Sequence, residues 1–216
     1  MIAIDGPAGS GKSTVASRLA RRLQRPHIDT GAIYRTLTLL SQRAGIPSDD
    51  GPAIAKLARR IDIDMGGGKI LLDGTDITRD IRSSEVTKAV STVAAHPEVR
   101  QTTLEIQRQL VPAEGAVVEG RDIGTVVLPD AELKIFLTAD PQERARRRAA
   151  ELQSEGKTID EKRVLDEMQA RDRIDTDRST SPLRPADDAV VLDTTGKDAD
   201  AVVQEILDIL KERGDG

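Results

Sequence analysis

The sequence lacks cysteine and tryptophan, and its only aromatic residues besides histidine are Tyr34 and Phe136. The absence of cysteine excludes disulfides, thiolate metal sites and thiol catalysis, and it is typical of a reducing compartment. With so few aromatic side chains the core must be aliphatic, and ligand stacking on aromatic rings is hardly available. Recognition of a flat, polar ligand would therefore depend on hydrogen bonds.

The chain also lacks long apolar runs and an excess of positive charge. No apolar run approaches the length that spans a membrane, and the N-terminus shows no signal-peptide pattern. The formal net charge of −5 disfavours a general polyanion-binding surface, although local arginine clusters are compatible with it. We therefore expect a cytoplasmic protein with no nucleic-acid or membrane partner. Its 216 residues suffice for one α/β domain.

The clearest motif follows the first apolar run. Residues 6–13 read GPAGSGKS, the G-x-x-x-x-G-K-S pattern of a phosphate-binding loop. In such a loop backbone N–H groups face the phosphates, Lys12 reaches the β- and γ-phosphates, and the Ser13 hydroxyl ligates Mg²⁺. Apolar residues with helical spacing follow, so the phosphates would meet a helix N-terminus. The predicted triphosphate-binding residues are Gly6, Pro7, Ala8, Gly9, Ser10, Gly11, Lys12, Ser13 and Thr14.

Short apolar strands alternate with amphipathic helices at both ends of the chain, which predicts a parallel sheet. The expected strands are 1–5, 27–29, 117–119, 133–137 and 189–192. The expected helices outside the arginine-rich segment are 32–43, 85–95, 98–110 and 200–213. Between them, residues 61–74 alternate around a triple glycine, which predicts a hairpin outside the main sheet.

The segment from 141 to 178 is predicted to form two polar helices, and Arg144, Arg147 and Arg148 share one helical face. A phosphate loop alone is shared by GTPases, ATPases and small-molecule kinases. The D-x-x-G spelling at 193–196 follows the last predicted strand, and the chain has no asparagine for an N-K-x-D motif, so we predict a turn there. A kinase needs a second anion site and a positive lid that excludes water, and the arginines can provide both.

Five segments together resemble bacterial cytidylate kinases in order and spacing over nearly the whole chain. They are GPAGSGKST at 6–14, DTGAIYR at 29–35, EGRDIGTVV at 119–127, LKIFLTA at 133–139 and RDR at 171–173. The resemblance implies a single-domain P-loop kinase fold, with a five-stranded parallel sheet flanked by helices. The implied parts are a core at about 1–30, 112–140 and 186–216, a nucleoside-monophosphate-binding region at about 31–111 with a hairpin insertion at about 61–82, and a helical lid at about 141–180.

The resemblance further implies Mg²⁺-dependent phosphoryl transfer from ATP to CMP or dCMP, and we expect the protein to be a monomer. The implied CMP-binding residues are Thr30, Arg35, Ser91, Arg100, Arg121, Asp122, Arg171, Asp175 and Arg178. The implied catalytic residues are Lys12, Arg121, Arg144 and Arg148. Ser91, Arg100 and Asp122 would read cytosine, because a carboxylate near N4 and a guanidinium near N3 and O2 complement its donors and acceptors. Uracil would leave buried polar groups unpaired.

Two alternatives remain beside this interpretation. One is a broader UMP/CMP kinase or another small-acceptor P-loop kinase, and the other is a non-catalytic, ATP-gated RNA-binding module. The acidic charge and the scarcity of aromatic residues disfavour the second. Glu119 stands where an aspartate can occur in the family, which leaves its role toward the magnesium waters open. His27 and His96 lie outside the shared motifs and are predicted to be structural.

Overall fold

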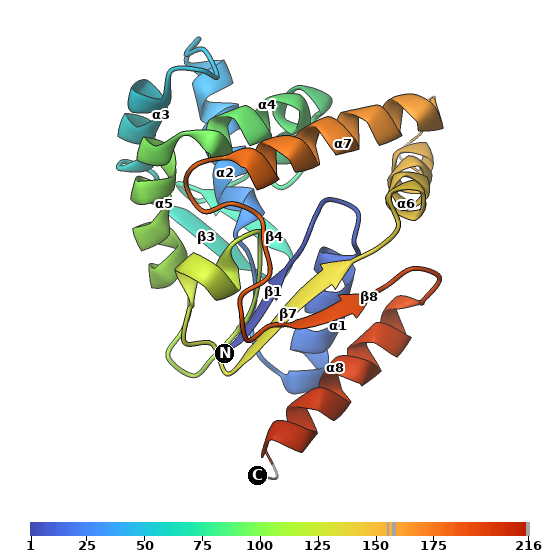
Figure 1. Cartoon of the computed structure of the whole chain (residues 1–216). Coiled ribbons are helices and arrows are strands. Elements are labelled where there is room, and N and C mark those ends of the chain that lie inside the picture. Colours follow the sequence, from blue (N-terminus) through green and yellow to red (C-terminus); the bar gives the residue numbers. More distant parts are fainter. Residues whose placement is uncertain (155, 157–158, 215–216) are drawn as a thin grey trace.

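A computed structural model describes residues 1–154, 156 and 159–214 (Figure 1). Five parallel strands form the main sheet in the order β2-β6-β1-β7-β8. Their bounds are Ile2–Asp5 for β1, His27–Asp29 for β2, Val117–Glu119 for β6, Leu133–Thr138 for β7 and Val190–Asp193 for β8. The predicted five-stranded parallel sheet is confirmed.

Strand β1 lies at the centre of this sheet, where Ile2 pairs with Val117 of β6 and with Leu133 of β7. All four residues of β1 are buried, as expected for a parallel strand that is covered on both faces. Helices α1 (Lys12–Leu23) and α8 (Ala199–Gly214) cover one face, with their aliphatic side chains packed on the strands. A 5-residue π-helix, Ile123–Val127, contributes apolar side chains to the other face.

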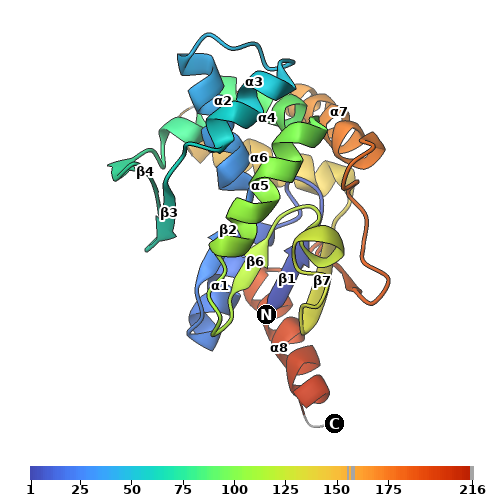
Figure 2. The same ribbon diagram turned by 90° about the vertical axis from the view of Figure 1, so that its left-hand side faces the viewer.

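A helical region extends beyond the carboxyl ends of the strands (Figures 1 and 2). It consists of α2 (Gly31–Arg43), α3 (Gly51–Ala58), α4 (Ser84–Ala95), α5 (Pro97–Gln109) and a short 3-10 helix, Asp80–Arg82. Helix α3 was not predicted from the sequence. Its signal is local: the Asp50 carboxylate caps the helix by accepting from the Ala53 N–H, and a proline occupies the first turn.

The predicted hairpin is confirmed as an antiparallel sheet apart from the main one. Strands β3 (Ile63–Gly66), β4 (Lys69–Leu72) and β5 (Thr75–Asp76) form it in that order, and Figure 2 shows it at the side of the helical region. Its buried faces pack on α2 through aliphatic residues such as Ile70 and Leu72. The hairpin is thus anchored to the helix that follows β2.

The arginine-rich segment folds into α6 (Pro141–Ser154) and α7 (Glu161–Asp177), as predicted. Ala145, Val164 and Met168 form a small apolar cluster that joins the two helices. Helix α7 runs across the carboxyl edge of the main sheet and packs against α4 (Figure 1). Among the described helices, none has the length and apolarity needed to cross a membrane.

Candidate functional site

The phosphate loop joins the end of β1 to the start of α1, and its backbone requires glycine at two points. Gly6 has φ of +144°, and a Cβ atom there would collide with the carbonyl oxygen of Leu137. Gly11, the residue before α1, has φ of +88°, in the left-handed region. These conformations wrap the loop around the N-terminus of α1, where unpaired N–H groups favour an anion.

Lys12 and Ser13 begin α1 and are tied to other parts of the protein. The Lys12 ammonium is buried and donates to the carbonyl oxygen of Pro7 at 2.6 Å. Burial, with the positive charge of Arg121 as a second cause, lowers the pKa of Lys12 to about 7. The Ser13 hydroxyl donates to Glu119 Oε2 at 2.8 Å. The negative charge of a bound polyphosphate would stabilise the protonated form of Lys12.

A cavity of about 510 Å³ opens beside the loop, a size that suits a small-molecule site. The triphosphate-binding residues predicted from the motif that line it are Ala8, Gly9, Gly11, Lys12, Ser13 and Thr14. All of the CMP-binding residues implied by the resemblance line it too: Thr30, Arg35, Ser91, Arg100, Arg121, Asp122, Arg171, Asp175 and Arg178. Side chains from α2, α4, α5, α7 and the segment after β6 therefore meet at one place.

Two acidic side chains organise the far end of the cavity. Asp122 Oδ2 lies 2.5 Å from Arg100 Nη2, and Asp175 Oδ2 accepts from Arg121 Nε at 2.9 Å. Arg178 reaches both acids, at 3.9 Å from Asp122 and 3.6 Å from Asp175. Only 3% of the Arg178 side chain is exposed, so it is a buried member of this network and not a surface ion pair.

Several buried polar atoms at this end have no hydrogen-bond partner within the described part of the chain. They are Ser91 Oγ, Arg100 Nε, Arg171 Nε and Arg178 Nη2. Leaving a buried polar atom unpaired costs about 1–3 kcal/mol, so such atoms in a cavity point to a polar ligand. Ion pairs therefore hold the side chains at the far end of the cavity in place, while several donors there remain available for a ligand.

Arginine side chains also crowd the middle of the cavity. Burial, together with neighbouring cations, lowers the pKa of Arg35 to about 10 and that of Arg171 to about 9. Arg35 Nη1 donates to Thr87 Oγ1 at 2.9 Å, and the Thr30 hydroxyl donates to the carbonyl oxygen of Glu119 at 2.8 Å. This excess of positive charge would be relieved by a phosphate dianion.

Asp5 links the phosphate loop to the segment that carries Asp122. Its two carboxylate oxygens accept from the N–H groups of Ile123 and Gly124, each at 2.8 Å. Burial raises the pKa of Asp5 to about 6, against the lowering effect of these two hydrogen bonds. Since Gly6 follows directly, the carboxylate connects the two ends of the cavity through the backbone.

The arginines of α6 divide between two places. Arg148 lines the cavity, whereas Arg144 donates to the carbonyl oxygen of Ala8 at 3.1 Å and pairs with Asp172 at 2.5 Å. Among the predicted site residues, Gly6, Pro7, Ser10 and Arg144 are not part of the cavity lining that the described residues form. Gly6, Pro7 and Ser10 belong to the phosphate loop itself, and Arg144 contacts this loop through the carbonyl oxygen of Ala8.

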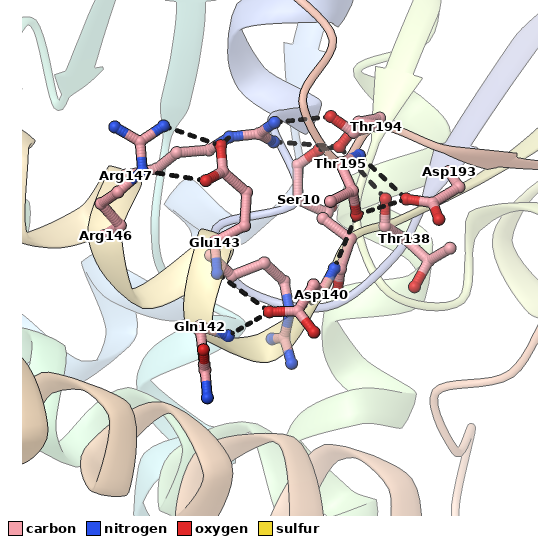
Figure 3. Close-up of polar contacts among 12 residues, drawn as sticks. Ser10, Thr138, Asp140, Gln142, Glu143, Arg146, Arg147, Asp193, Thr194 and Thr195 are labelled. Atoms are coloured by element: carbon pink, nitrogen blue, oxygen red, sulfur yellow. Dashed lines mark hydrogen bonds and ion pairs between the residues drawn. The ribbon is translucent and has the colours of Figure 1, made fainter.

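Arg147 contacts the turn after β8, as Figure 3 shows. Its Nη1 donates to Thr194 Oγ1 at 2.9 Å and its Nη2 to the Thr194 carbonyl at 2.6 Å. The Thr194 hydroxyl in turn lies 3.2 Å from the carbonyl oxygen of Ser10 and 3.1 Å from that of Thr138. The turn predicted at 193–196 is present, but no sequence pattern indicated that it connects α6 to the phosphate loop.

Tyr34 is a further residue whose role the sequence analysis missed. It lines the cavity, and its ring lies 5.3 Å below the Arg100 guanidinium, a cation–π arrangement. The Tyr34 hydroxyl accepts from Thr103 at 3.0 Å and from Gln107 at 3.2 Å. Tyr34 thereby holds Arg100 from below, and its place in the DTGAIYR segment is the signal that could have indicated it.

Comparison with known proteins agrees with this geometry. The family described as "Cytidylate kinase" matches residues 2–212. The chain belongs to the cytidylate kinase family. Among its relatives, the cytidylate kinase of Pelotomaculum thermopropionicum is 49% identical, over 95% of this chain and 93% of the relative. That of Desulfitobacterium hafniense is 48% identical, over 98% and 93%.

Solved structures resemble this cytidylate kinase family member at the level of fold. A gluconokinase from Sinorhizobium meliloti superposes with a TM-score of 0.51 at 16% identity, covering 98% of this chain and 91% of that chain. An uncharacterized protein from Eubacterium ventriosum gives a TM-score of 0.54 at 15% identity, covering 97% of both chains. At these identities the likeness extends to the fold alone.

Proposed function

We propose that the protein is a cytidylate kinase that transfers the γ-phosphoryl group of ATP to CMP or dCMP. The observation that carries this proposal is the shared cavity, in which a phosphate loop faces a second, arginine-rich anion site. A GTPase or an ATPase needs no such second site. Membership of the cytidylate kinase family supports the same acceptor.

The residues at the phosphate loop fit a bound Mg²⁺ ion. Magnesium prefers hard oxygen ligands and is usually held by one or two protein groups together with substrate phosphates and waters. The Ser13 hydroxyl would be its protein ligand, and the buried carboxylate of Glu119, hydrogen-bonded to that hydroxyl, would accept from its waters. When bound, the ion would neutralise negative charge on the β- and γ-phosphates.

Catalysis then consists of alignment and charge stabilisation. Lys12 and the loop N–H groups hold the triphosphate, while Arg35 and Arg121 hold the acceptor phosphate in line with it. An oxygen of the CMP phosphate attacks the γ-phosphorus, and the bond to the β-phosphate oxygen breaks to release ADP. The attacking oxygen is already anionic at neutral pH, so no general base is required.

Cytosine would bind at the far end of the cavity, between Ser91, Arg100 and Asp122. Asp122 would accept from the N4 amino group, and Arg100 would donate to N3 and O2. Uracil presents O4 to the carboxylate and an N3–H to the guanidinium, so neither buried group would find a complementary partner on the base. We propose that Arg171, Asp175 and Arg178 bind the sugar and phosphate beside it.

Residues 141–180 are proposed to form a lid that excludes water, and residues 31–111 to form the acceptor-binding region. Arg148 already faces the cavity and is our first candidate for stabilising the transferring phosphoryl group. Arg144 would have to leave Asp172 and Ala8 to reach that group. We further propose that the protein acts as a cytoplasmic monomer.

The test is ADP formation from Mg²⁺-ATP with CMP, dCMP, UMP or AMP as the acceptor, beside a control without acceptor. Turnover that requires a cytidine nucleotide supports the proposal. Equal rates with UMP would favour the broader UMP/CMP kinase, and acceptor-independent hydrolysis would favour an ATPase. ATP-dependent RNA binding without phosphoryl transfer would favour the non-catalytic module, which the net charge of −5 disfavours.

A further inference from the structure

His27 contacts the phosphate-loop side of the site through one carboxylate. Its Nε2 lies 2.8 Å from Glu119 Oε1, and the other oxygen of Glu119 accepts from the Ser13 hydroxyl at 2.8 Å. A carboxylate oxygen only accepts, so Nε2 is the donor here. His27, Glu119 and Ser13 thus form a continuous hydrogen-bonded chain from the edge strand β2 to the first turn of α1.

We propose that His27 is a positioning residue for the metal–nucleotide site, a role that rests on the proposed function. Its N–H fixes the rotation of the Glu119 carboxylate, which in turn fixes the direction of the Ser13 hydroxyl. Because the Ser13 proton is committed to Glu119, the lone pairs of its oxygen stay free for a cation. Groups that orient a metal ligand from behind often change metal affinity by about 10–100-fold when they are removed.

The sheet register explains why this position needs a donor. Asp29 pairs with Glu119 across β2 and β6, and His27 lies two residues before Asp29 on the same face of β2. Two acidic side chains therefore stand side by side at the carboxyl ends of the strands, and both line the cavity. The His27 ring donates to Glu119 and favours one orientation of its carboxylate.

The other histidine provides a matched control within the chain. His96 Nε2 lies 2.9 Å from the carbonyl oxygen of Ser48, in the helical region, and His96 does not line the described cavity. The prediction that both histidines are structural is consistent with this placement of His96. For His27, the contact with Glu119 leads us to propose the positioning role instead of a purely structural one.

The test compares wild type with His27→Ala, His27→Gln and His96→Ala by calorimetric binding of the non-hydrolysable β,γ-imido analogue of ATP. Each titration is done with excess Mg²⁺ and again with EDTA. We expect His27→Ala to weaken binding of the Mg²⁺ complex by about 10-fold and to leave binding in EDTA within about 2-fold. His27→Gln, which retains an N–H donor, should recover most of the Mg²⁺-dependent affinity, and His96→Ala should match wild type.

The outcomes separate this proposal from the proposed function. If wild type binds the analogue but His27→Ala binds its Mg²⁺ complex equally well, the positioning role alone is overturned. The same holds if His27→Ala weakens binding equally with Mg²⁺ and with EDTA, since that indicates a general packing defect. Failure of wild type to bind the analogue would overturn both. Thermal unfolding of each variant ensures that only folded protein is compared, and the glutamine variant keeps the test decisive if the alanine variant does not fold.

Discussion

The two ends of the cavity are built in different ways. The proposed triphosphate end consists of one continuous segment, residues 6–14, and would bind mainly through backbone N–H groups that glycine conformations expose. The acceptor end consists of side chains from α2, α4, α5, α7 and the segment after β6, held by buried ion pairs. A site of the first kind would recognise phosphate in general, whereas a site of the second kind could select one base.

The two ends of the cavity are connected through Asp5. Asp5 stands directly before the phosphate loop and accepts from the backbone just after Asp122. A change at Lys12 should therefore affect only the triphosphate end, a change at Asp122 only the acceptor end, and a change at Asp5 the stability of both.

The largest effect is expected for Lys12→Ala, which breaks the triphosphate end alone. Removing the ammonium that we propose to stabilise the transferring phosphoryl group should lower kcat by about 10²–10³-fold. The affinity for CMP, measured by calorimetry without ATP, should stay within about 2-fold of wild type. Near-normal turnover in this variant would refute the proposed role of the loop.

The second effect concerns Asp5 and the pH dependence of stability. The pKa of Asp5 is raised from 3.8 to about 6 by burial, which corresponds to about 3 kcal/mol at about 1.4 kcal/mol per pH unit. Since the folded protein binds this proton more tightly than the unfolded chain, its stabilising contribution is full below pH about 4 and is lost as the pH rises through about 6.

Chemical denaturation of wild type and Asp5→Asn between pH 4 and 7 measures this loss. The free energy of unfolding of wild type should fall relative to that of the variant over this range, by about 2 kcal/mol, and the difference should be constant at higher pH. The variant supplies the control for all other titrating groups. If the difference in free energy of unfolding between wild type and Asp5→Asn did not change with pH, the raised pKa of Asp5 would be contradicted.

The third prediction concerns Asp122→Asn, which changes the acceptor end. Losing the charged group that we propose as the acceptor for the cytosine amino group should lower the ratio of kcat/KM for CMP to that for UMP by about 50-fold. The variant also leaves the buried Arg100 without its ionised partner and should be less stable. The ratio of two substrates is independent of the folded fraction, and an unchanged ratio would remove Asp122 from base selection.

The smallest effect is expected for Thr194→Val, a change at a residue outside the cavity lining that the described residues form. The isosteric change removes the hydroxyl that joins Arg147 to the backbone of Ser10. Steady-state kinetics should give a KM for ATP raised by about 5-fold with an unchanged KM for CMP. Thr195→Val is the neighbouring control, because its hydroxyl contacts Asp193 and Asp140 instead. Equal effects of the two variants would contradict a specific connection through Thr194.

The contrast between the two ends explains what the sequence could predict. The phosphate loop, the parallel sheet and the hairpin arise from local patterns, and the structure confirms the sheet and the hairpin. The proposed acceptor residues extend from Thr30 to Arg178, over more than half of the chain, and only the family resemblance brought them together. Whether Arg178 is buried or exposed depends on how the end of α7 packs, which no local pattern records.

Other features depend on pairings that the sequence does not show. The contact of His27 with Glu119 requires the β2–β6 register, and that of Arg147 with Thr194 requires the placement of α6 beside β8. Arg144 illustrates the same limit, since its spacing with Arg148 predicted a shared face but not its pairing with Asp172. Helix α3 was missed although its aspartate cap and proline are local signals.

The proposed selection of cytosine is tested most directly by a competition between equal concentrations of CMP and UMP for Mg²⁺-ATP in the wild-type protein. The initial ratio of CDP to UDP, measured by chromatography, equals the ratio of the two kcat/KM values. The proposed pairing of Arg100 and Asp122 with cytosine predicts CDP in excess by about 100-fold or more. Comparable amounts of CDP and UDP would contradict it, even if the phosphoryl transfer itself were rapid.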